Sequence, residues 1–167
     1  MTARPLILIG GATVLAVAAI IGISLFLTPD STNPAYATAV DFMNSAGSND
    51  DASAFALLSD EMQAYVRTNC PEESVSACID AYTPPEWGGL LKAVFRRAVP
   101  DGEAFDILLF ATYEEGVGFS GVCIYHRVEE VTEDDWRVTA WAGFLHCEEP
   151  DASIQRLREA DAVNRVP

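Results

Sequence analysis

The sequence predicts an α+β domain held outside the cytoplasm by one transmembrane helix. Three patterns in its 167 residues carry this prediction. Residues 6–27 form one apolar run, residues 34–82 place apolar side chains at helical spacing, and residues 91–145 alternate apolar and polar side chains as β-strands do. Helices followed by consecutive strands that pair with one another are typical of an α+β fold.

The apolar run Leu6–Leu27 is long enough to cross a bilayer. Its 22 residues span about 33 Å as a helix, and a bilayer's hydrocarbon core is about 30 Å thick. Arg4 precedes the run and Asp30 follows it, so the positive-inside rule places residues 1–5 in the cytoplasm. We therefore expect a single-pass protein of the plasma membrane, in which residues 28–34 link the helix 6–27 to an extracytoplasmic domain.

A cleaved signal peptide is the alternative interpretation of this run. Ala35-Tyr36-Ala37 resembles a cleavage site, but the run exceeds the roughly 7–15 apolar residues of such signals. The site also lies well past the end of the run, which favours a retained anchor. Ala12, Ala16 and Ala19 share one face of the helix, as small residues do where transmembrane helices pack together. The general abundance of Ala in anchors explains them equally well.

The charged residues are concentrated beyond the anchor. All 25 acidic residues lie from Asp30 onward, together with 9 of the 10 basic ones, and the chain has a net charge of −15. Such a surface repels the phosphates of nucleic acids, so we expect no nucleic-acid partner. The acidic surface serves solubility, or it is a docking face for a basic partner.

Four cysteines also lie beyond the anchor, at Cys70, Cys78, Cys123 and Cys147. An even number on the oxidising side of the membrane favours disulfide bonds. We expect Cys70 to pair with Cys78, which is close in sequence, and Cys123 to pair with Cys147 across a hairpin. A zinc site is the weaker alternative, since the chain has no C-x-x-C pair.

The first half of the outer domain is predicted to be helical. Asn33 and Pro34 are typical of an N-cap and a first helical residue, and Gly47 to Asp50 end that helix. A second helical segment covers residues 51–66, which Ser59 can split by capping a new helix. A third helix is expected from Pro71 to about Tyr82. The buried stripe of the second segment is Phe55, Leu58, Met62 and Tyr65.

The second half is predicted to form four antiparallel strands. They cover residues 91–99, 104–113, 119–131 and 136–145, and the last two form a hairpin around Thr132–Asp135. The second strand alternates clearly, so that Phe105, Ile107, Leu109, Ala111 and Tyr113 share one face. Residues 148–167 form a polar C-terminal tail with a short helix over residues 153–163.

Two groups of residues resemble the nuclear transport factor 2-like superfamily, whose members form an α+β cone related to cystatins. One group is the helical opening Ala39-Val40-Asp41-Phe42-Met43 with residues 50–59. The other is the meander of residues 102–107, 113–116 and 134–138. The resemblance covers residues 34–147 and implies a cone-shaped domain over residues 35–147. It does not select a function, because this fold includes isomerases, dehydratases, hydrolases and non-catalytic scaffolds.

Enzymes of this superfamily place a few acid–base groups inside the cone. The candidates here are Asp106, Tyr113, Tyr125, His126 and His146. His126 and His146 share a face of the predicted hairpin as diagonal neighbours, which would allow metal or acid–base chemistry if Asp106 joined them. The favoured interpretation is two ordinary surface or rim histidines, because strand parity puts Asp106 opposite the apolar stripe. The sequence contains no G-x-S-x-G, H-E-x-x-H or phosphate-binding glycine loop.

Five aromatic residues are candidates for a pocket or a protein interface, although core packing is the simpler explanation. They are Trp87, Phe110, Phe119, Trp136 and Trp141.

The function expected from these observations is that of a non-catalytic accessory or scaffold subunit of a larger membrane complex. Membrane-anchored members of the resembled superfamily often have such roles, and electron-transfer, transport or secretion assemblies would all be suitable hosts. The partners would be membrane protein subunits, and no cofactor or metal is expected. The alternatives are an extracytoplasmic module that binds or senses a small ligand, and a hydrolase or isomerase of the same fold.

Overall fold

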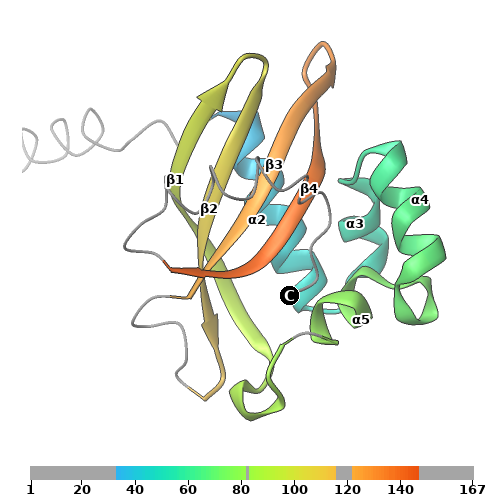
Figure 1. The fold of residues 1–167 in the computed structure, drawn as a ribbon, viewed down its shortest axis with the longest axis vertical. Helices are drawn as coiled ribbons and strands as arrows, with labels where there is room; N and C mark the ends of the chain where they lie inside the picture. The colour runs from blue at the N-terminus through green and yellow to red at the C-terminus, as the bar shows by residue number, and fades with distance from the viewer. Residues whose placement is uncertain (1–32, 82, 116–121, 147–167) are drawn as a thin grey trace, which may run out of the picture. The chain divides into compact units, whose positions relative to one another are not determined.

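The computed structural model describes residues 33–81, 83–115 and 122–146, with side chains up to Ala142. Its helices are α2 (Pro34–Gly47), α3 (Asp51–Ala56), α4 (Asp60–Asn69) and α5 (Val75–Asp80), with short 3₁₀ turns at Pro71–Glu73 and Pro85–Trp87. Four strands follow, and they form one antiparallel sheet (Figure 1). The predicted order, helices first and an antiparallel sheet afterwards, is confirmed.

No helix in this described part has the length and hydropathy that a membrane span needs. The predicted anchor 6–27, with Ala12, Ala16 and Ala19, lies outside the described residues, as do most of the linker 28–34 and the tail 148–167.

The helix boundaries follow from local capping. The Asn33 side chain accepts a hydrogen bond from the Ala35 amide at 2.9 Å, and Pro34 occupies the first helical position of α2. Ser59 accepts from the Met62 amide at 3.3 Å and starts α4, so the predicted split of the second helical segment is confirmed.

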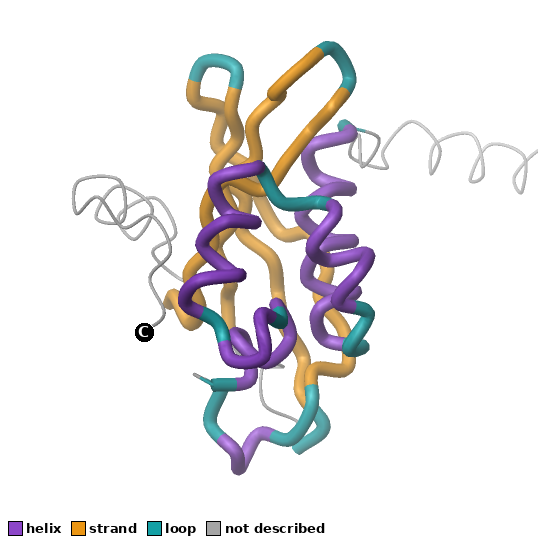
Figure 2. Tube along the Cα trace, turned by 90° about the vertical axis from the view of Figure 1, so that its right-hand side faces the viewer, coloured by secondary structure: helices purple, strands orange, loops and turns teal. Residues whose placement is uncertain are grey.

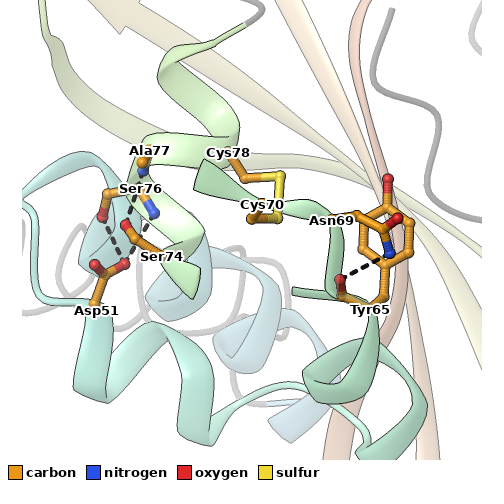
Figure 3. Close-up of a disulfide and its surroundings, with 8 residues drawn as sticks. All are labelled: Asp51, Tyr65, Asn69, Cys70, Ser74, Ser76, Ala77 and Cys78. Atoms are coloured by element: carbon orange, nitrogen blue, oxygen red, sulfur yellow. Dashed lines mark hydrogen bonds between the residues drawn. A yellow bond between two sulfur atoms is a disulfide. The ribbon is translucent and has the colours of Figure 1, made fainter. Parts of the chain in front are cut away.

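The α5 region is held by a disulfide and by a partly buried polar contact (Figure 3). Cys70 and Cys78 are disulfide-bonded, as expected from their spacing. Asp51 accepts hydrogen bonds from the Ser76 amide at 2.9 Å and the Ser76 hydroxyl at 3.0 Å. The expected helix start at Pro71 is wrong: Glu72 and Glu73 both have φ of 55°, which interrupts an α-helix, and α5 begins after the Ser74 cap.

Replacing Cys70 and Cys78 by serine is expected to lower the free energy of unfolding by about 2–3 kcal/mol, because the bond restrains the unfolded chain. Denaturation of the oxidised variant and the oxidised wild type would measure this difference. Asp51→Asn serves as a control that loosens the same helix without opening the covalent loop. Equal stability of the double serine variant and the wild type would contradict the expectation.

The strands are β1 (Leu90–Asp101), β2 (Ala104–Tyr113), β3 (Val122–Thr132) and β4 (Asp135–His146), paired in sequence order. β2 has the predicted bounds, and β1 is longer than predicted. It continues through Pro100, which pairs with Phe105. Proline is tolerated there because β1 is an edge strand, where a missing N–H breaks no ladder bond.

The helical layer is hydrogen-bonded to both edges of the sheet, at one residue of each edge strand. On β1, the Asn44 side chain accepts from the Ala93 amide at 2.8 Å and donates to the Ala93 carbonyl at 3.0 Å. On β4, Val138 exchanges backbone hydrogen bonds with Leu57 and Ser59, at 2.9 and 3.0 Å. Unpaired edges recruit other strands, so these contacts oppose edge-to-edge association.

The main core lies between the helices and one face of the sheet, and Figure 2 shows the helices gathered on that side. The predicted alternation of β2 is confirmed, since Ile107, Leu109, Ala111 and Tyr113 belong to this core and Phe105 packs against it. The opposite face of the sheet carries a smaller apolar cluster of Leu108, Tyr125 and Ala142. We call it the outer face.

Candidate functional site

Three places in the domain carry chemically notable groups: the core around His126, the buried acid Asp106, and a groove beside the start of α4. The first is separate from the other two, which share Arg127 and Glu129. The core around His126 faces the helices, whereas Asp106 lies on the outer face.

His126 is completely buried. It pairs with Ile107 on β2 and Trp141 on β4, and its ring lies 5.5 Å from the Phe42 ring, centroid to centroid. Neither of its ring nitrogens has a hydrogen-bond partner among the described residues. Burial lowers the pKa of His126 to about 3, so the ring is neutral at physiological pH.

The expected surface or rim position of His126 is therefore wrong, and so is its expected proximity to His146. The hairpin register places His126 opposite Trp141 and His146 opposite Val122. Four residues of β3 separate these two rows, or about 13 Å at 3.3 Å per residue. Asp106 cannot complete a site with His126 either, because the two belong to opposite faces of the sheet.

Asp106 is completely buried on the outer face, in a network of charged and polar groups. Its Oδ1 accepts hydrogen bonds from the Tyr125 hydroxyl at 2.5 Å and from Arg127 at 3.3 Å. Arg127 also forms ion pairs with Asp101 at 3.0 Å and Glu129 at 2.6 Å. Strand parity predicted the face of Asp106 correctly, and its burial and its pairing with Arg127 were not predicted.

Two members of this network, Tyr125 and Arg127, have raised pKa values. Burial is the main cause that raises the pKa of Tyr125 to about 12, so its hydroxyl remains a donor. Partial burial opposes the charge on Arg127, but its hydrogen bonds to Glu129 and Asp101 outweigh this and raise its pKa. Arg127 therefore places a positive charge next to the buried Asp106 carboxylate. Its ion pairs with Asp101, Asp106 and Glu129 connect β1, β2 and β3.

An open groove of about 780 Å³ lies beside this network, between the start of α4 and the turn ends of β3 and β4. Asp60, Glu61, Glu129 and Asp135 contribute carboxylates to its lining, and Arg127 and Arg137 contribute guanidinium groups. Both arginines are engaged: Arg137 forms an ion pair with Asp135 at 2.6 Å and donates to the Ala56 carbonyl. The groove thus offers an acidic surface.

The candidate aromatic residues do not form one pocket. Trp141 is buried, with its ring 5.4 Å from Phe42, centroid to centroid. Trp136 packs on Phe105 and Trp87 packs on Tyr113, with centroids 5.6 and 5.2 Å apart. Phe110 belongs to the outer face, under Arg96 at 4.3 Å, and Phe119 lies outside the described residues.

The cysteine and metal expectations have separate outcomes. Cys123 is disulfide-bonded, and its expected partner Cys147 lies outside the described residues. Within residues 33–81, 83–115 and 122–146, no three His, Cys, Asp or Glu side chains are grouped as metal ligands.

Sequence reasoning missed two residues that dominate these places, Phe42 and Arg127. Phe42 gave a signal, since it follows Ala35 and Ala39 at helical spacing on the buried side of α2. The sequence signal for Arg127 was weaker: it is the one Lys or Arg residue of β3, and the residue opposite it on β2 is Asp106.

Comparisons with protein-family models, with curated proteins and with solved structures found no match for this chain. The function therefore has to be argued from the geometry described above.

Proposed function

We propose that this chain is a non-catalytic accessory or scaffold subunit of a larger membrane protein complex. Residues 6–27 anchor it and pack among other transmembrane helices, and the acidic extracytoplasmic domain docks on neighbouring subunits. Electron-transfer, transport and secretion assemblies are all suitable hosts. The nuclear transport factor 2-like resemblance belongs to this proposal, supported by the order of helices and strands and by α2 lying across the sheet.

The observation that carries the proposal is the filled core between the helices and the sheet. Phe42, His126 and Trp141 occupy the centre of that core with at most 1% of their surface exposed. A ligand-binding or catalytic module of this kind needs a cavity with a few convergent polar groups. Here the His126 side chain is completely buried and packs against aromatic rings. The Asp106 carboxylate is also completely buried and forms an ion pair with Arg127.

The acidic groove supports the docking part of the proposal. Its carboxylates outnumber its guanidinium groups, and it lies beside the exposed first turn of α4. Complementary charge mainly raises the rate and the specificity of association, so a basic surface on a partner subunit would fit this groove.

The test is gentle detergent extraction from the native membrane, followed by native-gel separation and mass spectrometry. We expect the chain to co-migrate with a defined set of membrane subunits. Replacing Ala12, Ala16 and Ala19 by leucine should release it from that set, because larger side chains keep helix backbones apart.

Ala18→Leu is the matched control, because Ala18 lies on the opposite side of a helix from Ala16 at 3.6 residues per turn. It should leave co-migration intact at an equal amount of membrane-inserted protein. Migration of the wild-type chain alone, as a monomer or a dimer, would refute the accessory role.

A further inference from the structure

His126 is a polar side chain whose place in the main core is not explained by stability. Its ring is completely buried, and neither ring nitrogen has a hydrogen-bond partner among the described residues. Buried polar groups are nearly always hydrogen-bonded, because an unpaired one keeps the full cost of leaving water. An apolar side chain of similar size would suit this position better, so the histidine requires a different explanation.

The side chains that pack around this ring provide no negative charge. α2 contributes Phe42, β2 contributes Ile107 and β4 contributes Trp141. Apart from disulfide-bonded cysteines, the titratable side chains of this core are phenols, those of Tyr36, Tyr65 and Tyr113.

The charged side chains of the surrounding elements lie away from the ring. Asp41 of α2 is exposed, and so are Asp60 and Glu61 in the first turn of α4. Asp106 of β2 belongs to the outer face of the sheet, and Arg137 of β4 lines the acidic groove. In the closed domain, a protonated ring at position 126 would therefore be a buried cation without a counter-ion, which is strongly unfavourable.

The shortest route from solvent to His126 leads past β4 and α4. β4 is both a neighbour of β3 and an edge of the sheet, whereas β2 and β1 lie on the other side of β3. Trp141 of β4 is the register partner of His126, and its ring centroid lies 6.5 Å from that of Tyr65 on α4. Figure 1 shows α4 beyond the β4 edge. Outward movement of α4 would let water reach the ring without separating any strands.

The attachments of α4 allow such a movement without unfolding of the domain. The helix starts at the Ser59 cap, whose amide donates to the Val138 carbonyl of β4 at 3.0 Å. Its other end is joined to α5 by the disulfide between Cys70 and Cys78. α4 is therefore a short element fixed at both ends, which can open and close again.

We propose that His126 is an acid-sensitive switch that opens α4 away from β4. In acid the ring takes a proton from solvent, and the resulting cation favours the conformation in which water can solvate it. Opening exposes the apolar side chains of Met62 and Val66 on α4 and of Trp141 on β4. The start of α4 also lines the acidic groove, so opening removes one wall of that groove. The switch is internal to the chain and does not depend on the proposed role in a complex.

Hydrogen–deuterium exchange of the detergent-solubilised full chain at pH 6.5 and pH 4.5, measured by mass spectrometry, tests this proposal. We expect the amides of α4 to be less protected than those of α2 and β2 at both pH values, because they exchange through local opening. After correction for intrinsic exchange rates, the protection of α4 should fall about 50-fold between pH 6.5 and pH 4.5. This factor follows from a pKa of about 3 for His126 in the closed domain and 6.5 where it is solvated.

His126→Phe is the matched control, because it keeps an aromatic ring and removes the ionisable group. The 50-fold fall should disappear in this variant, and any small pH dependence that remains belongs to surface acids such as Asp60 and Glu61. His126→Leu serves the same purpose if phenylalanine disturbs the fold.

Two kinds of result would overturn the proposal. Protection of α4 equal to that of β2 or α2 would mean that α4 opens only together with the rest of the domain. Absence of the fall in the wild type, or the same fall in the variants, would mean that His126 does not control the opening.

Discussion

Lowering the pH from 7 to 4.5 is expected to destabilise the folded domain by about 2–3 kcal/mol through His126 alone. The ring is completely buried among Phe42, Ile107 and Trp141, and burial lowers its pKa to about 3, against 6.5 in the unfolded chain. Between pH 6.5 and pH 3, His126 is therefore protonated in the unfolded state and neutral in the folded state. The contribution of His126 is fully present above pH 6.5 and is lost as the pH falls from 6.5 towards 3.

The measurement is denaturant unfolding of the detergent-solubilised full chain, followed by tryptophan fluorescence at several pH values. His126→Phe should flatten the pH dependence between pH 6.5 and 4.5, because an apolar ring suits this site and takes up no proton. The pKa of Asp51 lies below its usual value of 3.8, so its contribution is lost only at lower pH. His146→Gln removes the contribution of the second histidine, and an unchanged slope in His126→Phe would contradict this account.

Local signals predicted most of the fold. The caps Asn33 and Ser59 set two helix starts, and the alternation of β2 gave its bounds and its inward face. The errors have physical causes that lie outside local sequence. Pro100 stays in a strand because β1 is an edge, and the α5 start moved because Glu72 and Glu73 adopt positive φ.

The candidate site was harder to predict, because its residues lie on different strands and come together only through the pairing register of the sheet. Three irregularities interrupt the pairing of β3 with β4, and each shifts the partner of every later residue. A regular register around Thr132–Asp135 already pairs His126 with Trp141, as the structure does, so the expected proximity of His126 and His146 did not follow from the hairpin and these irregularities are not the cause of the error. Parity gave the face of Asp106, whereas its contacts with Tyr125 and Arg127 depend on the pairing of β2 with β3, which no alternation pattern encodes.

Arg127→Met is expected to lower the free energy of unfolding by about 3–5 kcal/mol, the largest effect that we expect from one substitution here. The Asp106 carboxylate is completely buried, and Arg127 is the cation paired with it at 3.3 Å. Removing the arginine leaves a buried negative charge without that partner, while methionine preserves much of the side chain's apolar length. Denaturant unfolding at pH 7 would measure the change.

Two further variants separate loss of charge pairing from loss of packing. Tyr125→Phe removes one hydrogen bond to Asp106 and keeps the charge pair, so it should cost about 1–3 kcal/mol. Combining Arg127→Met with Asp106→Leu removes the buried charge as well, and should recover most of the stability lost in the single variant. If the double variant is less stable than Arg127→Met alone, the network contributes through packing, and buried charge is not the reason that Arg127 matters.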